Sequence, residues 1–363
     1  MHELSSLTII VPTYNRHIFA KRTISYWSGK KPKIIVLDGS ERPLDKNFIN
    51  SLKDNVKYFH EINLPYQERM EKVHDLVTTK YCMLHADDEF FLPSGLLKCI
   101  KEIEKNDLVC CVGRCLEFNF KDSEIHSQPW LPLHAPFDGY SLLDERPLAR
   151  ILKHMHPYLC STIYGVTKTE VFLNNICTAI NKDFENFFFE LGYEISSAYQ
   201  GKSKVINCLS WLRSNENPPF YTKETKDNTV EEKPHEIIIN ESFIKHPIVK
   251  LIANDLNRIN KKYSTNVLEE VVFSALNSYA YQANLTNHLA HLFKNTLIQD
   301  CKEKDILKNL IGGDSNVKFK NKTRGLLNVV KLWVKNGIVS NEQEIIEIEN
   351  TISNFHQNNI TQI

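Results

Sequence analysis

Three acidic residues, Asp87, Asp88 and Glu89, stand side by side in the stretch YCMLHADDEFF at residues 81–91. A short apolar run precedes them and two phenylalanines follow. Adjacent carboxylates repel one another, and a bound divalent cation relieves that repulsion. Ligands that are all oxygen atoms favour Mg²⁺ or Mn²⁺ over zinc, and such a cation usually also binds substrate phosphates. The triplet therefore indicates a metal site for a phosphorylated ligand, although a solvated loop before a helix would also explain it.

Two further groups of polar residues stand directly after short apolar runs. The first is Pro12, Thr13, Tyr14, Asn15 and Arg16, and the second is Asp38, Gly39 and Ser40. An aspartate at a strand end can accept hydrogen bonds from a ribose, and an aromatic ring can stack on a base. Taken singly, these residues are also explained as helix caps and turn residues. Together with the acidic triplet they indicate a site for a nucleoside diphosphate with a metal on its phosphates.

These residues need a scaffold that brings the ends of the apolar runs together, and the first third of the chain has the pattern of one. Apolar runs near residues 7–12, 33–38, 56–60, 81–86 and 107–113 alternate with segments of helical spacing. Such alternation predicts an α/β fold with a mostly parallel sheet flanked by helices. Ligands of parallel sheets bind beyond the carboxyl ends of the strands, which is where the polar groups stand.

The rest of the chain divides into three parts. Residues 114–180 predict an insertion with long loops around a strand at Ser161–Thr167, before a helix that ends at Gly201 and a strand that ends at Arg213. Residues 214–236 are polar, lack a period and hold three prolines, which is typical of a loop or linker. We therefore expect a nucleotide-binding and catalytic domain at 1–213, a linker at 214–236 and a helical C-terminal region at 237–363.

The composition limits the class of protein. With 363 residues, of which 42% are hydrophobic, the chain is long enough for two domains with a sizeable core. Lys+Arg and Asp+Glu are both 44, so the formal net charge is zero and no nucleic-acid partner is expected. Nine cysteines without C-x-x-C spacing are typical of reduced thiols in a cytosolic protein. No apolar run has the length of a membrane span or forms an export signal, so we expect a cytoplasmic protein.

Three stretches in this order, IIVPTYNR, IIVLDGS and YCMLHADDEF, resemble the N-terminal half of inverting GT-A glycosyltransferases, a superfamily that builds bacterial polysaccharides and glycoconjugates. The resemblance implies a GT-A, Rossmann-like fold and a nucleotide-sugar donor. It implies that the nucleoside is held by Pro12, Thr13, Tyr14 and Asp38. It also implies that the acidic triplet stands at the family's metal-binding D-x-D motif, with Mn²⁺ or Mg²⁺ as cofactor. We expect Asp88 as a ligand, with Glu89 or Asp87 beside it.

A similarity in the second half concerns the catalytic base and the contacts to the sugar. The stretch FFFELGYEISSAYQGKSKVI resembles the family's E-D-x-x-L helix, and Glu190 matches the position of the general base. The residue after Glu190 is Leu191, where the family usually has Asp. Asp183, Glu185 and Glu194 therefore remain candidates for the base as well. Residues expected near the donor sugar or diphosphate are Arg69, Asp87 and Arg213.

The implied activity is the metal-dependent transfer of a sugar to an acceptor hydroxyl, with inversion, in bacterial surface glycan assembly. Two different functions stay open. A sugar nucleotidyltransferase shares a Rossmann-like core but usually begins with a Gly-rich loop, and PTYNRHIF has no glycine. A non-catalytic nucleotide- or glycan-binding protein of the same fold is compatible with the missing Asp after Glu190.

The C-terminal region has a basic segment. Its members are Lys318, Lys320, Lys322, Arg324, Lys331 and Lys335, around Trp333. Basic residues beside an aromatic ring can hold a protein on anionic lipid headgroups, which suggests peripheral association with the inner face of a membrane and a lipid-linked or glycan acceptor. A solvated helix face with Trp333 in the core, or a homodimer contact, explains the same pattern. We expect this region not to contact the nucleotide.

Overall fold

The computed structural model describes residues 3–62, 64–129, 141–156, 158, 162–179, 186–216, 247–295, 323–335 and 337–359. The strands are β1 (Leu7–Thr13), β2 (Lys33–Asp38), β3 (Val56–His60), β4 (Tyr81–Leu84), β5 (Phe90–Phe91), β6 (Cys110–Lys121), β7 (Glu124–Pro129), β8 (Ser141–Leu142), β9 (Val166–Lys168), β10 (Ser203–Ser214) and β11 (Thr323–Arg324). The helices are α1 (His17–Trp27), α2 (Lys46–Ser51), α3 (Tyr66–Glu71), α4 (Val73–Leu76), α5 (Pro93–Asn106), α7 (Pro147–His154), α8 (Thr169–Ala179), α9 (Asn186–Gln200), α12 (Pro247–Ile259), α13 (Thr265–Asn295), α15 (Leu326–Lys335) and α16 (Glu342–Asn359).

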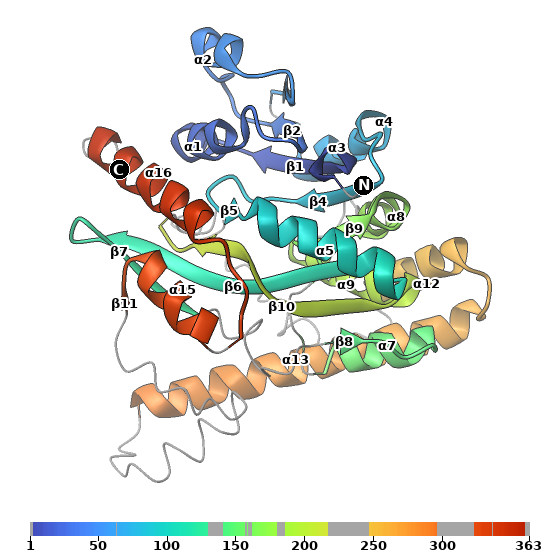
Figure 1. Ribbon diagram of the computed structural model, residues 1–363. Helices are drawn as coiled ribbons and strands as arrows, with labels where there is room; N and C mark the ends of the chain where they lie inside the picture. Colours follow the sequence, from blue (N-terminus) through green and yellow to red (C-terminus); the bar gives the residue numbers. More distant parts are fainter. Residues whose placement is uncertain are drawn as a thin grey trace.

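Strands β3, β2, β1 and β4 form the parallel half of an 11-stranded sheet. Figure 1 labels β2, β1 and β4 in this part of the sheet. β1 pairs with β2 on one side and with β4 on the other, and Thr13 lies opposite Asp38 at the carboxyl ends. Most side chains of β1 and all side chains of β4 are buried, as expected of parallel strands covered by helices on both faces. The polar residues after β1, β2 and β4 therefore meet at one edge of the sheet.

Beyond β4 the sheet is mixed, which differs from the mostly parallel sheet that the sequence predicted. β9 runs antiparallel to both β4 and β6, whereas β10 runs parallel to β6. β6 continues to Lys121 and turns into β7 through Asp122 and Ser123, whose φ angles are 54° and 62°. Two successive left-handed residues make a tight hairpin whose twist matches that of its strands. This hairpin replaces part of the loop-rich insertion expected at 114–180.

Helices cover both faces of the sheet. Because side chains alternate between the two faces along a strand, the contacts of successive residues show which helices cover which face. Ile9 and Val11 of β1 pack in one core with α1, α5, α15 and α16. Ile10, between them, packs in a second core with α3, α4, α8 and α9. Burial of apolar surface on both faces stabilises three layers. The predicted α/β fold with a GT-A-like sheet and flanking helices is confirmed.

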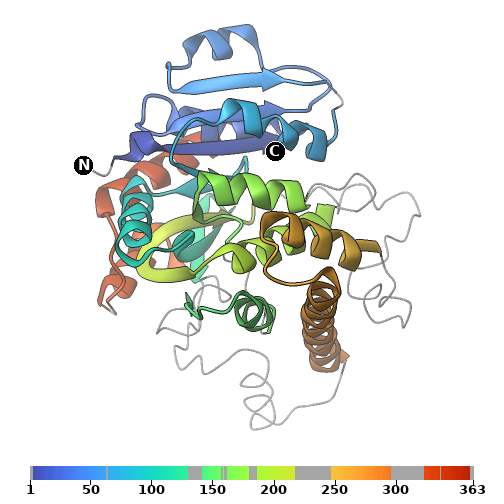
Figure 2. The ribbon, with the colours of Figure 1, turned by 90° about the vertical axis from the view of Figure 1, so that its right-hand side faces the viewer.

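The C-terminal helices belong to two different cores, and the predicted helical character of this region is confirmed. α12 and α13 pack against α7 and α9, and Figure 2 shows them on the side of the molecule away from α15 and α16. In α15, Trp333 is only 2% exposed and packs in the core of β1, which supports the structural explanation of the basic segment. Lys318, Lys320 and Lys322 lie outside the described residues. The domain boundaries at 213 and 237 stay predictions.

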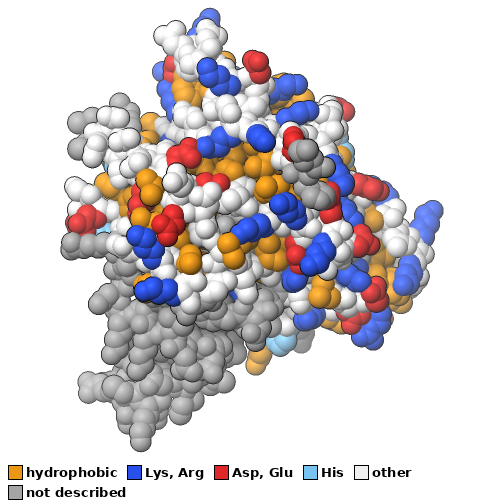
Figure 3. All heavy atoms as spheres, viewed as in Figure 1, with side chains coloured by type: hydrophobic (Ala, Val, Ile, Leu, Met, Phe, Trp, Pro, Cys, Tyr) orange, Lys and Arg blue, Asp and Glu red, His pale blue; other side chains and the backbone are white. Residues whose placement is uncertain are grey.

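The surface of the described residues is mixed in charge. On the face shown in Figure 3, basic and acidic side chains are interspersed among apolar ones. None of the described helices is long and apolar enough to cross a membrane.

Candidate active site

A cleft of about 200 Å³ opens beyond the carboxyl ends of β1 and β4. It is lined by Pro12, Arg16, Tyr66, Leu84, His85, Ala86, Asp87, Ile163 and Tyr164. Residues from the first strand, from the acidic stretch and from the segment before β9 therefore share one hollow. This is the place at which α/β sheets bind their ligands.

The acidic stretch brings two carboxylates onto one cationic group. Arg16 Nη1 lies 3.0 Å from Asp87 Oδ1, and Arg16 Nη2 lies 2.5 Å from Asp88 Oδ2. Thr13 donates a hydrogen bond of 2.6 Å to Asp87 Oδ2 and so fixes that carboxylate against the end of β1. Burial raises the pKa of both aspartates, and the charge of Arg16 opposes this shift.

These carboxylates fit a divalent cation. Asp87 Oδ1 is buried and, among the described residues, has the ion pair with Arg16 but no hydrogen bond, so a cation could use this oxygen atom only where Arg16 leaves it. Asp87 and Asp88 supply oxygen atoms, the type of ligand that Mg²⁺ and Mn²⁺ prefer. Within the described residues no group of three or more His, Cys, Asp or Glu side chains could hold a metal ion. A cation at this place would therefore need oxygen atoms from water or from the phosphates of a ligand.

Glu89, expected as a metal ligand, faces another part of the molecule. Its Oε2 accepts a hydrogen bond of 2.7 Å from Trp211 Nε1 on β10, and the residue is 5% exposed. Burial, with a further contribution from the charge of Asp88, raises the pKa of Glu89 to about 8. The structure thus brings Asp87 and Asp88, and not Glu89, to the guanidinium of Arg16. The physical reason is that the chain turns into β5 directly after Glu89 and points its side chain at β10.

The buried Glu89 makes stability depend on pH. The folded protein keeps this proton up to about pH 8, whereas the unfolded chain loses it near its ordinary pKa of 4.5. Since the folded state binds more protons in this window, the free energy of unfolding falls as the pH rises, by about 1.4 kcal/mol per pH unit for one proton. Glu89→Gln, whose amide oxygen can still accept from Trp211, is expected to flatten this slope.

The measurement is urea unfolding with chelator present between pH 5 and pH 8.5. Glu89→Gln is expected to gain stability over the wild type toward pH 8.5 and to leave Mn²⁺ binding with nucleotide unchanged. Glu170→Gln, an exposed change on α8, serves as the control for a lost charge. A parallel pH dependence of variant and wild type, or a loss of Mn²⁺ binding, would contradict the assignment.

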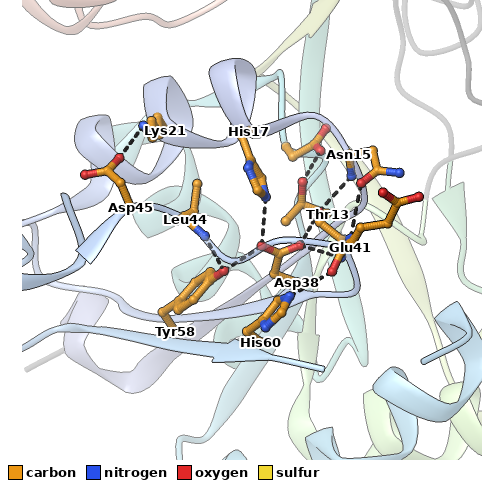
Figure 4. A network of polar contacts seen from close by, with 12 residues as sticks. Thr13, Asn15, His17, Lys21, Asp38, Glu41, Leu44, Asp45, Tyr58 and His60 are labelled. Carbon is orange, nitrogen blue, oxygen red and sulfur yellow. Dashed lines mark hydrogen bonds and ion pairs between the residues drawn. The ribbon is translucent and has the colours of Figure 1, made fainter. Parts of the chain in front are cut away.

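Asp38 organises a network of polar contacts at the ends of β1 and β2, as Figure 4 shows. Its Oδ1 accepts from the backbone amide and the hydroxyl of Ser40, at 2.8 and 2.5 Å, and its Oδ2 accepts from Tyr58 at 2.6 Å. His17 Nε2 lies 3.1 Å from Oδ2. Ser40 in turn accepts from the backbone amide of Asn15 at 2.8 Å. The network joins the loops after β1 and β2, so these predicted nucleotide-binding residues are brought together.

Tyr58 and His17 were not predicted for this site. Burial and the hydrogen bond to Asp38 raise the pKa of Tyr58, which therefore stays a donor at neutral pH. His60, two residues after Tyr58 on β3, contacts the carbonyl of Ser40 at 2.7 Å. Tyr58 and His60 stand two residues apart in VKYFH and therefore on the same face of β3, and this spacing is the sequence signal that could have identified these two residues.

His85, in the acidic stretch itself, was also missed. Trp27 Nε1 donates to His85 Nε2 at 3.0 Å, and His85 Nδ1 lies 2.6 Å from the carbonyl of Ala86. Burial lowers the pKa of His85 to about 4, so the ring is neutral at physiological pH. It forms a wall of the cleft beside Asp87 without adding charge.

Arg69, expected near the donor sugar, braces the backbone instead. It is 3% exposed and donates to the carbonyls of Leu64, Thr13 and Leu37 at 3.0, 2.8 and 2.5 Å. A Cβ atom on Gly39 would lie 2.6 Å from Arg69 Nε, so glycine leaves the room that this side chain needs. Arg69 therefore positions the ends of β1 and β2.

Arg213, the second arginine expected near the diphosphate, is not among the residues that line the cleft. Its Nη1 lies 4.0 Å from Glu117 Oε2 on the neighbouring strand β6. Its side chain is 38% exposed, which fits the interpretation as a surface arginine.

The first half of α9 places two candidate bases one helical turn apart. Glu190 Oε1 accepts a hydrogen bond of 2.5 Å from Tyr158, and Glu190 is partly exposed. Its neighbour Phe189 packs edge-on against Tyr66, a residue of the cleft, at 5.1 Å between ring centroids. Glu190 thus lies on a helix that adjoins the cleft.

Glu194, the second candidate base on α9, is fully buried. Its carboxylate accepts from the backbone amides of Thr162 and Ile163, both at 3.0 Å, and lies 2.7 Å from His154 Nε2. It therefore holds the loop whose next residues line the cleft, and it has no open side toward an acceptor. Asp183 and Glu185, which are also candidates for the base, lie outside the described residues.

The C-terminal helix α16 reaches the acidic stretch through two buried side chains. Arg22 of α1 donates to the carbonyl of Asp88 at 2.8 Å and to Glu216 at 2.6 Å. Glu216 also pairs with His356 of α16. The side chains of Arg22 and Glu216 are only 1% and 2% exposed. Because hydrogen bonds between buried charged groups are strong, this network fixes the position of the loop that carries Asp88. The helix expected to stay away from the nucleotide thus supports the loop of Asp88.

The comparison with known families agrees with this geometry. Residues 8–163 match the sequence profile of the family described as glycosyl transferase family 2. The match covers the parallel half of the sheet, the acidic stretch and the loop before β9. It confirms the predicted resemblance to the GT-A glycosyltransferase superfamily and supports glycosyltransferase activity. No curated protein matches the chain.

Solved structures of similar shape include TarS of S. aureus. Its residues 1–349 superpose with a TM-score of 0.49 and 12% sequence identity, over 82% of this chain and 76% of that one. The complex of the same fragment with UDP-GlcNAc gives a TM-score of 0.45 and 14% identity, over 84% and 78% of the two chains. The complex with UDP gives 0.44 and 14%, over the same shares.

Proposed function

We propose that this protein is a metal-dependent, inverting glycosyltransferase that moves a sugar from a nucleotide-sugar donor to an acceptor hydroxyl. One observation carries the proposal: the carboxylates of Asp87 and Asp88 converge on a single cationic group in a cleft beyond the carboxyl ends of β1 and β4. Carboxylates at such a place suit a ligand that brings phosphates together with a divalent cation. The family profile matched by residues 8–163 supports the same class of reaction.

In the proposed reaction the residues in and around the cleft each have one task. Pro12, Thr13, Tyr14 and the loop around Asp38 hold the nucleoside, because they stand at the ends of β1 and β2. Asp87 and Asp88 would hold Mg²⁺ or Mn²⁺, which when bound neutralises charge on the diphosphate leaving group. Glu190 takes the proton of the acceptor hydroxyl while that oxygen attacks the anomeric carbon from the side opposite the diphosphate. The hydrogen bond from Tyr158 fixes the orientation of Glu190.

The experiment that tests this function is a panel of nucleotide sugars, assayed for release of the nucleoside diphosphate with Mn²⁺, with Mg²⁺ and with chelator. We expect release with one donor class, dependent on a divalent cation. Release of pyrophosphate from a sugar phosphate and a nucleoside triphosphate would instead indicate a nucleotidyltransferase. Nucleotide binding without turnover of any donor, with or without glycan acceptors, would indicate a binding protein.

The acceptor, a role in surface glycan assembly and an association with membranes are further parts of this proposal. On α15, Lys331 and Lys335 flank the exposed side chains of Leu332 and Val334, a combination that suits an anionic lipid surface or a second copy of the chain. Co-sedimentation with anionic vesicles at low and high salt, together with light scattering, separates these two partners. Absence of vesicle binding at low salt removes the membrane from the proposal.

A further inference from the structure

Arg16 stands between the two carboxylates of the acidic stretch and the open part of the cleft. Its guanidinium contacts Asp87 and Asp88 through two different nitrogen atoms, and it lines the cleft together with Asp87. The side chain of Arg16 is 24% exposed, whereas those of Asp87 and Asp88 are 2% and 7% exposed. Of the three groups, the arginine is therefore the one that has access to solvent.

Asp87 and Asp88 are each held by a further neighbour besides Arg16. Thr13 donates to Asp87, and Arg22 donates to the main-chain carbonyl of Asp88 from the buried side. Arg16 comes directly after Asn15, whose φ of 52° ends the strand segment, and its own φ and ψ of −127° and 36° lie outside the helical region before α1 begins. Arg16 therefore lies in the short junction between β1 and α1, and not within the strand or the helix.

The same carboxylate oxygens cannot serve a guanidinium and a divalent cation at once. Two buried carboxylates side by side need a counter-charge, and in the absence of a cation Arg16 supplies it. A cation that binds here must displace Arg16, which costs the two ion pairs. A diphosphate in the cleft offers the displaced guanidinium a new partner, because a guanidinium binds phosphate oxygens as readily as carboxylates.

We propose that Arg16 is a built-in counter-ion that occupies the cation position of the ligand-free protein and passes to the diphosphate when donor and cation bind. This inference rests on the proposed function and deepens it, since it explains how the site avoids binding a cation without a donor. Arg16 thus hinders the binding of a free cation and attracts the diphosphate, so the binding of the one ligand is linked to the binding of the other. Arg16 is then a specificity-determining residue for the complex of cation and diphosphate.

The test uses two simple probes on the full chain: Mn²⁺ alone, followed by electron paramagnetic resonance, and inorganic pyrophosphate added to protein saturated with Mn²⁺, followed by calorimetry. Arg16→Gln is expected to bind Mn²⁺ alone at least about fivefold more tightly than the wild type and to bind pyrophosphate at saturating Mn²⁺ at least about fivefold more weakly. Opposite changes in the two affinities identify the proposed role of Arg16, because a structural defect would weaken the binding of both Mn²⁺ and pyrophosphate. Arg258→Gln, an exposed arginine of α12 that does not line the cleft, is the matched control and should change neither affinity.

A second variant covers the case that Arg16→Gln does not fold. Arg16→Lys keeps the charge but has one nitrogen atom in place of the two that bridge the aspartates. We therefore expect it to gain Mn²⁺ affinity as well, but less than Arg16→Gln does. Weaker or unchanged Mn²⁺ binding in a folded variant overturns the inference, and so does undetectable Mn²⁺ binding in the wild type with or without pyrophosphate. These outcomes leave the transferase proposal to its own assay, since turnover of a nucleotide sugar in excess chelator would show activity without this site.

Discussion

Glu190→Gln is expected to lower the turnover number by about 10²–10⁴-fold, the range that a positioned general base contributes, while donor binding stays within about twofold of the wild type. Glutamine keeps the shape of the side chain and can accept the hydrogen bond from Tyr158, but it cannot take a proton from the acceptor. Because the base acts on the acceptor hydroxyl and not on the nucleotide, its loss appears in the chemical step. The measurement is steady-state kinetics with the donor found in the panel, together with a nucleotide-binding titration.

Further variants make this result specific. Glu170→Gln, on the exposed side of α8, removes the same charge outside the cleft and should leave turnover unchanged. Asp183→Asn and Glu185→Gln test the two remaining candidates for the base. If Glu190→Gln is silent while one of those two variants loses turnover, the base has been assigned to the wrong residue.

Asp88→Asn is expected to lower kcat/KM by about 10²–10³-fold and to remove the dependence of nucleotide binding on Mn²⁺. The amide has nearly the same volume as the carboxylate but lacks the charge that balances a cation, and Asp87 would then face Arg16 alone. Donor contacts at the nucleoside end, around Asp38, should survive. Nucleotide binding without metal is therefore expected to stay near the wild-type value, measured by thermal shift with and without Mn²⁺.

The control for this variant is Asp75→Asn, an exposed aspartate of α4 that lies outside the cleft. It should leave both activity and Mn²⁺ dependence intact. Full activity of Asp88→Asn, or undiminished activity of the wild type in excess chelator, would take the metal out of the mechanism. In that case the transfer reaction would need another group to balance the charge of the diphosphate leaving group.

Much of the first half of the fold could be predicted because its signals are local. Short apolar runs such as LTIIV and KIIVL separated by helical spacing define parallel strands, and parallel strands end at a common edge. The polar residues after β1, β2 and β4 therefore had to meet, and Thr13, Asp38 and Asp87 do so. The mixed half of the sheet was not predicted, since the hairpin at Asp122 and Ser123 contains no glycine to mark the turn.

The sequence by itself determined that an acidic cluster, a polar loop after the first strand and an aspartate after the second lie at one edge of an α/β sheet. Only the tertiary structure decided which side chains turn toward the cleft. Glu89 points at Trp211 of β10, Arg69 at the carbonyls of β1 and β2, and Glu194 at the loop of Thr162. These directions depend on partners distant in the chain, whereas strand ends depend on neighbours within a few residues. A charged residue pattern can thus predict where a site lies, but burial and long-range hydrogen bonds determine which of its members remain available for chemistry.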